Sequence, residues 1–555
     1  MVSKDNAELV FCPLGGVGEI GMNFALYGFG PAAKRQWMIV DCGVTFPDLT
    51  LPGVDLVLPD IRFIEEQLEN LAGIVITHAH EDHYGALLDL WPRLKVPVWM
   101  TPFAAGMLAS KREGEAGAAK VPVNIYEAGQ RFKVGPFDIE AIAVTHSIPE
   151  PVSLAIRTPL GTLLHTGDWK LDPEPEIGPL TDEARFRALG DEGVLAMMCD
   201  STNALREGES PSEKAVSRGL QEVIEAAKHR VVVTTFSSNV GRIRSIAEAA
   251  RDAGRQVLVL GRSMHRVISV AEELGYMEDL PPFLSEEDYG YVPRENVVVL
   301  CTGSQGEDRA ALAKLARDEM RNVALATGDT VVFSSRVIPG NEKAILEIKN
   351  QLIDREIKVI EDTDALIHVS GHPRRIELKQ MYEWVRPHIL VPVHGEAAHL
   401  AGQAELARQS GIARPIQVRN GDLLRIAPGD PGIIDRVPYG RIFKDGRIIG
   451  TEEAVGVRDR RRLSFAGHVA VNVVLDDRYQ IDGDPDIVAI GLPKADQRGE
   501  NIEELMLDAA IGAIESIPRV RRKDLDLVSE AVRRAVRSSA NEAWGKKPIV
   551  TVFVT

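Results

Sequence analysis

The residues with the clearest chemical potential lie in one short segment, His78-Ala79-His80-Glu81-Asp82-His83, which offers four candidate metal ligands. Neutral imidazole suits zinc, and a neighbouring carboxylate suits a second, harder ion or a bridging position. His78 and His80 alternate on an extended stretch, whereas Asp82 and His83 fall where the chain turns toward a helix. The spacing predicts two adjacent metal sites that share one loop. A solvated polar turn is the alternative, and so dense a group of ligands disfavours it.

Other candidate ligands lie at or just beyond predicted strands elsewhere in the chain. They are His146, Asp168, His368, His372 and His394, and the last three belong to the strand-like segments Leu366–His372 and Ile389–Glu396. Alternating or apolar stretches from Phe137 to Thr145 and from Thr162 to Gly167 precede the first two. One such residue is usually structural, but a single loop cannot close two coordination spheres. We therefore expect His146 and Asp168 to join the centre, and we favour a ligand or catalytic role for the three later histidines.

Short strands and glycine-rich turns must position the ligand loop. Strands are expected near Glu8–Cys12, Phe24–Tyr27, Trp37–Val40 and, buried before the ligand loop, Gly73–Ile76. Gly16–Gly21 formally matches a dinucleotide-binding pattern, but a strand-like stretch follows it, so we interpret it as a hairpin turn. Asp41 ends the third strand. It is expected to brace the ligand loop as a hydrogen-bond acceptor, with a simple turn aspartate as the alternative.

From about residue 216 the pattern changes to repeated strand, turn and helix units, which predict a doubly wound parallel sheet. The strands end in small hydroxylic or glycine-rich turns at Phe236–Asn239, Gly261–Ser263, Thr302–Gly306 and Ser334–Arg336. We expect all four turns at one edge of the sheet, at helix N-termini, where N–H groups, Arg262 and Arg336 favour phosphate. Helix capping explains any one of them. Four turns on one edge favour phosphate binding.

Length, charge and cysteine content narrow the class of protein. A chain of 555 residues is too long for one core and predicts three or four domains. The formal charge of -17 argues against a general nucleic-acid coat but leaves room for a basic cleft. The four cysteines lack CxxC spacing, so neither a disulfide framework nor a cysteine zinc site is expected, and a cytoplasmic location fits best. The sequence shows neither a signal-peptide pattern at its start nor a run apolar enough for a membrane span.

The sequence of the C-terminal region predicts a small α/β unit. The turn-rich stretch Pro428–Gly432 predicts an exit from the compact body. The basic run Arg458–Arg462, which a solvated face would explain, precedes this unit. The expected elements are strands near Val469–Leu475, Ile487–Ile490 and Ile549–Val554, and helices near Asn501–Ile514 and Leu525–Arg537. The lack of ligand clusters suggests assembly more than chemistry.

The ligand set His78–His83, His146, Asp168 and His394 resembles the metallo-β-lactamase superfamily in its β-CASP nuclease branch. Further stretches are similar to the bacterial ribonuclease J family: Leu14–Gly21, His165–Asp168, Asp200–Ala204, Thr302–Gly306, Ser334–Glu342 and His368–Pro373. The resemblance covers nearly the whole chain. It implies an α/β fold: an αββα metallo-β-lactamase sandwich with an inserted doubly wound β-CASP domain and a small α/β C-terminal domain.

The implied boundaries are 1–215 for the first part of the metallo-β-lactamase domain, 216–370 for the β-CASP domain, 371–430 for the completing part, 431–460 for a linker and 461–555 for a C-terminal assembly domain. Within them, the resemblance assigns His78, His80 and His146 to one metal, Asp82, His83 and His394 to the other, and Asp168 to both as a bridge.

The resemblance also implies catalytic and substrate-binding residues. The catalytic residues are Asp82, Asp200 and His372; we hypothesise that His372 protonates or stabilises the leaving 3' oxygen and that Asp200 orients a neighbouring histidine. A histidine at the third β-CASP motif, His394, is typical of RNA-processing members. The implied 5'-phosphate pocket comprises Ser237, Ser238, Asn239, His368, Ser370, Gly371 and His372. Two departures from the family pattern, Gly241 and Glu150-Pro151, concern substrate contacts near this pocket.

The implied function is a two-metal ribonuclease of RNA maturation and decay. It would digest RNA from a 5'-monophosphorylated end and also cut internally. Two zinc ions are expected, with manganese or magnesium as the alternative in one position. The implied partners are 5'-monophosphorylated or single-stranded RNA, a homodimer or homotetramer, and an RNA-decay complex, with no membrane.

Two other functions remain in competition. A hydrolase of the same fold would act on a lactam, thioester or lactone, although such a substrate needs no second phosphate-binding domain. An inactive RNA-binding scaffold would lack a ligand, and none is missing.

Overall fold

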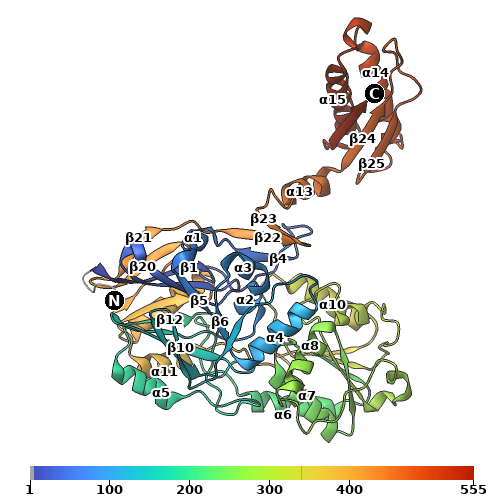
Figure 1. The fold of residues 1–555 in the computed structure, drawn as a ribbon. Helices are drawn as coiled ribbons and strands as arrows, with labels where there is room; N and C mark the ends of the chain where they lie inside the picture. The colour runs from blue at the N-terminus through green and yellow to red at the C-terminus, as the bar shows by residue number, and fades with distance from the viewer. Residues whose placement is uncertain (1–5, 339) are drawn as a thin grey trace. The chain divides into compact units, whose positions relative to one another are not determined.

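The computed structural model describes residues 6–338 and 340–555, which form two compact units (Figure 1). One unit holds the described residues up to Thr45 together with Leu58–Arg441; the other holds Phe46–Val57 and Ile442–Thr555. Pro339 of the Ser334–Glu342 stretch and the first five residues of the chain start lie outside the described residues. Among the helices that are described, none is long and apolar enough to span a membrane.

The first unit is built around two β-sheets. One sheet runs in the spatial order β21 (Gly432–Arg436), β20 (Asp422–Ala427), β1 (Glu8–Gly15), β2 (Phe24–Gly30), β3 (Gln36–Val40), β5 (Leu71–Val75), β6 (Val98–Met100) and β7 (Val123–Ile125). The other runs β19 (Arg414–Pro415), β18 (Ile389–Val393), β12 (Ala196–Asp200), β11 (Gly161–His165), β10 (Val152–Thr158), β9 (Phe137–Ala143) and β8 (Arg131–Val134). Inward-facing side chains of both sheets, such as Phe11 and Val40 from one and Leu154 and Met198 from the other, share one core. The two sheets therefore form a sandwich.

Helices cover the outer faces of this sandwich. The helices α5 (Glu183–Glu192), α11 (Arg375–Val385) and α12 (Ala397–Gln409) pack their apolar residues on the seven-stranded sheet. On the other sheet, the ring of Phe63 in α1 (Arg62–Glu65) packs edge-on against Trp37 of β3. The short α2 (Glu81–Tyr84), α3 (Leu87–Leu94) and α4 (Pro102–Glu113) follow β5 and β6 along the chain. The predicted αββα sandwich is confirmed.

A third sheet, which is fully parallel, interrupts the sandwich. Its order is β14 (Gln256–Leu260), β15 (Val297–Cys301), β13 (Val231–Thr234), β16 (Thr330–Phe333) and β17 (Lys358–Ile360). The helices α9 (Ala311–Ala316) and α10 (Glu342–Asp354) share a core with one set of alternate strand residues. The helix α7 (Val240–Asp252) packs against β14 and β15 outside that core, and α6 (Glu213–Ala226) and α8 (Arg262–Glu273) complete the layer. The sheet is doubly wound, as predicted.

Two local predictions for this domain are wrong. Only α7 and α8 begin at their turns, α7 directly after Asn239 and α8 at Arg262. Thr302–Gly306 and Ser334–Arg336 are separated from α9 and α10 by further residues. In the first of these turns Gly303 and Gly306 adopt positive φ angles of 113° and 79°, which carry the chain away from helical geometry. In addition, Leu366–Val369 forms no strand. The carbonyl of Ile367 instead accepts hydrogen bonds from two side chains, those of Arg242 and Ser334.

After the parallel sheet the chain returns to complete the sandwich. Strand β18 pairs in parallel with β12, and β20 pairs antiparallel with β1. The stretch Pro428–Gly432 turns the chain from β20 into the antiparallel β21, so the chain does not leave the first unit there. The sequence-based domain boundaries remain a prediction.

The second unit contains the sheet β25 (Asp486–Ile490), β24 (His468–Val473) and β26 (Ile549–Val554), with α14 (Ile502–Ser516) and α15 (Leu525–Trp544) packed in one core with it. These elements agree with the predicted ones. The basic run Arg458–Arg462 lies in α13 (Val457–Ala466). The remaining strands are β4 (Leu56–Pro59), β22 (Arg441–Asp445) and β23 (Ile448–Gly450).

Candidate metal centre

The ligand loop is shaped by the end of β5 and the start of α2. His80 keeps an extended backbone and α2 begins at the next residue, so the histidine pair precedes the turn while Asp82 and His83 lie in the helix. Asp41 braces the loop from β3, as its position predicted. Its Oδ1 accepts the N–H of Thr77 at 2.8 Å, and its Oδ2 accepts Nδ1 of His83 at 2.7 Å. The bond to Nδ1 leaves Nε2 of His83 to face the centre.

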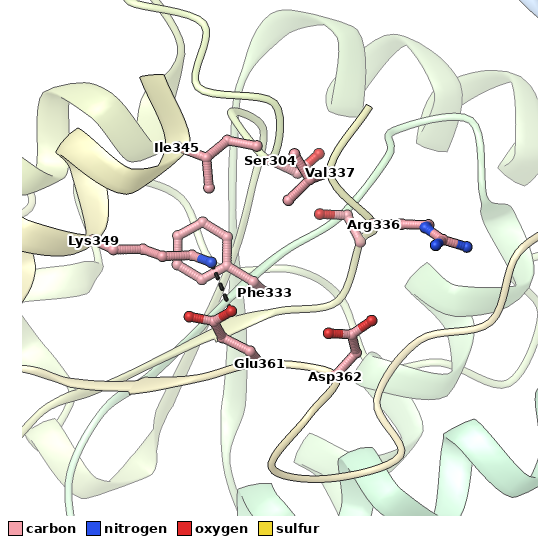
Figure 2. Close-up of a pocket in the computed structure, with 9 residues that line it drawn as sticks. Ser304, Phe333, Arg336, Val337, Ile345, Lys349, Glu361 and Asp362 are labelled. Carbon is pink, nitrogen blue, oxygen red and sulfur yellow. Dashed lines mark ion pairs between the residues drawn. The ribbon is translucent and has the colours of Figure 1, made fainter. Parts of the chain in front are cut away.

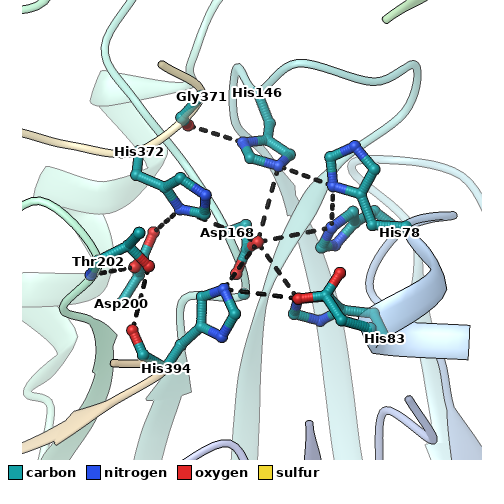
Figure 3. A network of polar contacts seen from close by, with 12 residues as sticks. His78, His83, His146, Asp168, Asp200, Thr202, Gly371, His372 and His394 are labelled. Carbon is teal, nitrogen blue, oxygen red and sulfur yellow. Dashed lines mark hydrogen bonds and ion pairs between the residues drawn. The ribbon is translucent and has the colours of Figure 1, made fainter. Parts of the chain in front are cut away.

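One carboxylate oxygen, Oδ2 of Asp168, lies at the middle of the site (Figure 3). It is 3.8 Å from Nε2 of His78 and 3.7 Å from Nε2 of His146. It is also 3.2 Å from Nε2 of His83 and 3.4 Å from Nε2 of His394. Imidazole nitrogens from three separate segments therefore surround one carboxylate oxygen.

The first of two ligand sets around this oxygen consists of three imidazoles. The Nδ1 atom of His80 lies 3.1 Å from Nε2 of His78 and 3.1 Å from Nε2 of His146. Ligand atoms about 2.0–2.1 Å from a tetrahedral zinc are separated from one another by roughly 3.3 Å. Together with Asp168, the three histidines therefore match the donor spacing of a zinc site.

The second set combines a carboxylate with two imidazoles. Oδ2 of Asp82 lies 3.6 Å from Nε2 of His83 and 3.7 Å from Nε2 of His394. His394 follows β18 and adopts a positive φ of 50°, which turns its ring toward Asp168. Within each set all ligand atoms lie within 4.8 Å of one another. Asp168 is common to both sets.

One buried polar atom of the site supports a metal. Oδ1 of Asp168 has no hydrogen-bond partner among the described residues. Buried polar atoms of a protein are nearly always satisfied, so an unpartnered carboxylate oxygen among imidazoles calls for a cation. Imidazole nitrogens with carboxylate oxygens are the donors that zinc and manganese accept. The residues present fit a pair of divalent ions.

Burial and neighbouring charges shift the histidine pKa values of the two ligand sets in opposite directions. Burial lowers the pKa of His78 and His146 well below the usual value and that of His80 to about 4, which makes these rings neutral donors. Burial also opposes protonation of His83 and His394, but the surrounding carboxylates, Asp168 foremost, together outweigh it and raise both pKa values. The pKa of Asp168 is correspondingly held far below its ordinary value, despite burial, mainly by His394 and His83. Metal binding at the second set must therefore displace protons.

A further histidine stands beside both sets. Nδ1 of His372 donates to Oδ2 of Asp200 at 2.7 Å, and the Asp200 carboxylate also accepts the N–H of Thr202 at 2.9 Å (Figure 3). Burial alone would lower the pKa of His372, but Asp200 and then Asp168 raise it to about 9. The histidine that Asp200 orients is thus His372 itself. Both carboxylates therefore favour the protonated form of the His372 ring.

The segment that carries His372 is tied to the ligands. The carbonyl of Gly371 accepts Nδ1–H of His146 at 2.7 Å, and a Cβ atom on Gly371 would lie 2.6 Å from that ring. Only glycine allows the backbone at position 371 to come this close to the His146 ring. Nδ2 of Asn203 donates to Oγ of Ser370 at 2.9 Å and to the carbonyl of His372 at 3.0 Å. Asn203 lies in the Asp200–Ala204 stretch, but the sequence did not predict that its side chain would hold the segment of His372.

Asn23 is a second missed residue. Its Nδ2 lies 3.0 Å from Nε2 of His83 and donates to the carbonyl of Asp82 at 3.2 Å. It belongs to the connection between β1 and β2, which confirms the hairpin interpretation of Gly16–Gly21. A lone asparagine in a glycine-rich turn carries no sequence signal for this contact.

The predicted phosphate-binding residues lie at the carboxyl end of the parallel sheet. Ser237 and Ser238 follow β13 and are half-buried, while the side chain of Asn239 caps α7 by accepting the N–H of Arg242 at 2.9 Å. The 368–372 segment reaches the same edge because Oγ of Ser334, at the end of β16, donates to the Ile367 carbonyl at 2.6 Å. Strands β13 and β16 are neighbours. Both parts of the predicted pocket therefore lie at the ends of adjacent strands.

Arg336 was expected to add positive charge to this edge. It instead lines a cavity of about 270 Å³ with Asp362, Phe333 and the ion pair between Lys349 and Glu361, whose Nζ and Oε2 atoms are 2.7 Å apart (Figure 2). The charges of this cavity are balanced, so it offers no preference for phosphate.

The two departures from the family pattern occupy different surroundings. A Cβ atom on Gly241 would make only ordinary contacts, the nearest at 3.5 Å. Glu150, in contrast, has a positive φ of 58° and two firm partners. Its Oε2 accepts the N–H of Phe103 at 2.6 Å and its Oε1 accepts the hydroxyl of Tyr276 at 2.9 Å. Glu150 therefore joins the His146 loop to α4 and to the inserted domain.

Four family models match the chain. The Beta-lactamase superfamily domain matches residues 36–186, and the Ribonuclease J, beta-CASP domain matches 228–352. The Zn-dependent metallo-hydrolase RNA specificity domain matches 356–418, and the Ribonuclease J C-terminal domain matches 455–555. The matches follow the chain in the order that the sequence predicted.

Curated relatives match nearly the full length. Ribonuclease J of Sinorhizobium meliloti is 64% identical over 548 residues, which cover 99% of this chain and 97% of the relative. Ribonuclease J of Mycobacterium tuberculosis is 36% identical, with 98% and 96% covered, and that of Thermus thermophilus is 34% identical, with 99% and 95% covered. A solved structure from Enterococcus faecalis, described as a protein of unknown function, aligns with a TM-score of 0.51 at 16% identity, over 75% of this chain and 100% of that chain. It shows the fold alone.

Proposed function

Because the chain belongs to the ribonuclease J family and is a metal-dependent ribonuclease, we propose that it hydrolyses RNA at a two-metal centre. It would remove nucleotides stepwise from a 5'-monophosphorylated end and also cut internally. The convergence of both ligand sets on Oδ2 of Asp168 is the observation that carries this proposal.

His78, His80 and His146 would hold one ion, and Asp82, His83 and His394 the other, with Asp168 shared. We propose zinc for both, with manganese or magnesium as the alternative at the carboxylate-containing set. When bound, two divalent ions lower the pKa of a water molecule and stabilise the charge that develops on the phosphate. The imidazole rings of the first set are already neutral. The residues of this set therefore favour zinc more strongly than the residues of the second set do.

His372 would serve as the general acid. Hydrolysis joins the oxygen of water to phosphorus and breaks the bond to the leaving 3' oxygen, which needs a proton. With Nδ1 bonded to Asp200, the other ring nitrogen of His372 is free to deliver a proton. Asp200 is fully buried and bonded to the Thr202 backbone, so the His372 ring is held in one orientation.

The 5'-phosphate would bind where the connections of the parallel sheet diverge. The chain leaves β13 toward β14 on one side and leaves β16 toward β17 on the other. In open α/β sheets a crevice at this point, outside the carboxyl ends of the strands, is the usual ligand site. Ser237, Ser238 and Asn239 follow β13, and His368, Ser370, Gly371 and His372 lie near the end of β16. Because the same segment carries His372, a bound 5' end would place the first linkage near the metal ligands.

The proposal is tested on RNA labelled at its 3' or 5' end and carrying a 5'-monophosphate, 5'-triphosphate or 5'-hydroxyl. Wild-type protein is expected to release mononucleotides fastest from the monophosphate, and long fragments would report internal cleavage. Asp82→Asn and Asp168→Asn should lose cleavage together with bound metal. Equal rates on all three 5' ends would contradict the phosphate pocket. Undiminished cleavage by the two variants would contradict the metal assignment.

We further propose a homodimer or homotetramer and a place in an RNA-decay complex. Light scattering after gel filtration of the full chain would give the mass of the assembly. A cytoplasmic location stays a prediction.

A further inference from the structure

Four charged side chains form a buried cluster between the sandwich and the parallel sheet. Lys170 Nζ lies 2.9 Å from Oδ2 of Asp172 and 3.1 Å from Oε1 of Glu213. The guanidinium of Arg242 donates to Oε2 of Glu213 from two nitrogens, at 2.6 Å and 3.2 Å. All four residues are buried, and Lys170 and Arg242 are 0% and 1% exposed. The cluster carries two positive and two negative groups and is neutral as a whole.

One end of the cluster is attached to the metal-ligand loops. Lys170 follows the ligand Asp168 by two positions, and its backbone N–H donates to the carbonyl of Thr145 at 2.8 Å. The Thr145 hydroxyl donates back to the Lys170 carbonyl at 2.7 Å. Thr145 directly precedes the ligand His146. Lys170 is therefore held by the two loops that supply His146 and Asp168.

The other end is attached to the segment that carries His372. Nη1 of Arg242 donates to Oγ of Ser334 at 2.7 Å and to the carbonyl of Ile367 at 3.2 Å. Farther along the same segment, Gly371 accepts the ring N–H of His146. The contacts form a closed ring that runs from His146 through Thr145, Lys170, Glu213, Arg242 and Ile367 to Gly371 and back.

The energetics argue against a purely stabilising role. Removing four charges from water is costly, and apolar replacements of buried ion pairs are often neutral or stabilising. A buried ionic cluster is better explained by the geometry that it enforces. Here Glu213, the first residue of α6, receives both cations, and its N–H also donates to Oδ2 of Asp172 at 2.9 Å. The cluster thereby fixes α6 and α7 against the loop after β11.

We propose that Glu213 and Arg242 are positioning residues that hold the Ile367–His372 segment in register with the metal ligands. They would contact neither metal nor RNA. This inference rests on the proposed role of that segment in binding the 5'-phosphate and the leaving group. Loss of the ring should displace His372 and the phosphate pocket together, while the metal ligands keep their own bonds.

The test compares full-length, metal-loaded variants. Glu213→Gln removes the central anion, and the double variant Glu213→Gln/Arg242→Met removes one charge of each sign and leaves Lys170 paired with Asp172. The matched control is Asp329→Asn, which removes an equally buried, arginine-bound carboxylate at the opposite end of the same sheet. Measurements are kcat and KM on 5'-monophosphorylated RNA, metal content, and the unfolding midpoint. The Kd values of a cleavage-resistant RNA with a 5'-monophosphate or a 5'-hydroxyl are measured as well.

Both ring variants are expected to lower kcat by about 10- to 100-fold, as loss of supporting residues around a metal site does. They should also lose most of the wild-type preference in Kd for the 5'-monophosphate, at unchanged metal content. Asp329→Asn should keep the wild-type kcat and the preference for the 5'-monophosphate, whatever its unfolding midpoint.

The proposal is overturned if the folded double variant retains wild-type kcat and 5'-end preference. It is also overturned if both ring variants fail to fold while Asp329→Asn folds, because the ring would then serve the fold. If wild-type protein itself shows no preference for the 5'-monophosphate, the proposed phosphate pocket fails instead, and the ring is judged on kcat alone.

Discussion

The two ends of the inserted parallel sheet each bury an arginine–carboxylate cluster, yet only one of them reaches the metal ligands. At the carboxyl end, Arg242 and Glu213 connect Ser334 after β16 to the loop after β11. At the amino end, Asp329 directly precedes β16 and pairs with Arg230, directly before β13, at 3.1 Å and with Arg294 at 2.8 Å. The central carboxylates, Glu213 and Asp329, are both buried and both paired with arginine. Burial and charge alone therefore do not mark a residue as functional.

What separates the two clusters is where their remaining bonds go. At the amino end, Arg230 and Arg294 donate to backbone carbonyls of Ala324, Ala326 and Thr327, so this cluster joins segments that precede β13, β15 and β16 of one sheet. At the carboxyl end, Arg242 and Lys170 connect segments from the sandwich and from the parallel sheet. A cluster that joins the sandwich to the parallel sheet can transmit geometry to the metal ligands, whereas a cluster within the parallel sheet holds only that sheet.

The strongest test of this difference is removal of the metals. A chelator is expected to abolish RNA cleavage completely, because the nucleophile and the charge on phosphate both depend on the ions. The parallel sheet and its amino-end cluster should remain folded, as measured by circular dichroism, and added zinc or manganese should restore cleavage. Cleavage that persists at undetectable metal content would contradict the assignment of the carboxyl end as the reactive one.

A smaller effect is expected from His372→Ala. Loss of a general acid typically costs about 10²- to 10⁴-fold in rate, so single-turnover cleavage should fall within this range. Metal content should not change, because His372 belongs to neither of the two proposed ligand sets and its Nδ1 is bonded to Asp200. A matched substitution of a half-exposed histidine elsewhere, His468→Ala in β24, should leave the rate unaltered. A rate for His372→Ala within twofold of wild type would contradict its role.

Asp41→Asn should act more weakly and only through the metal. The carboxylate holds the Nδ1–H of His83, and loss of such a support typically costs about 10- to 100-fold in metal affinity. Competition with a chelator should show a lower affinity for one of the two ions, and RNA cleavage should recover at high metal concentration. Equal weakening of both ions would show that Asp41 supports the whole loop.

The smallest effect concerns pH. The pKa of Glu213 is lowered to about 2 although burial opposes this, because Arg242 and Lys170 favour the carboxylate. The folded pKa is below the unfolded one, so this group contributes stability above about pH 4.5 that is lost as the pH falls toward 2. The difference in urea midpoint between wild type and Glu213→Gln should therefore be constant from pH 7 to 5 and narrow below 4.5. A difference independent of pH down to 3 would contradict the charge pairing.

Local chemistry made much of the site predictable. The density of histidine and aspartate in residues 78–83, after an apolar strand, predicted both the ligand loop and its extended and helical halves. His146, Asp168 and His394 were identified because each follows a strand, and strand ends gather at one edge of a sheet. Asp41 was recognised for the same reason. These inferences need only the hydrophobic periodicity of the sequence and the identity of the residues that can donate to a metal.

Other features depend on segments that only the fold brings together. Leu366–Val369 has a strand-like pattern, but side chains of Arg242 and Ser334 bind its backbone, so no strand forms. Asn23 contacts the ligands Asp82 and His83, and Asn203 contacts the segment that carries His372, both from turns that look ordinary in sequence. The ring through Lys170, Glu213 and Arg242 joins residues that share no spacing rule, and no local pattern reveals it.

The sequence by itself determined which atoms are available as ligands and which backbone shapes present them, because donor chemistry and local conformation depend on residue type and near neighbours. Only the tertiary structure decided which lone pairs meet at Asp168, which histidines carry protons and which buried charges serve the site. Desolvation and Coulomb interactions act through space, so they follow from the packing of distant segments and not from their order in the chain.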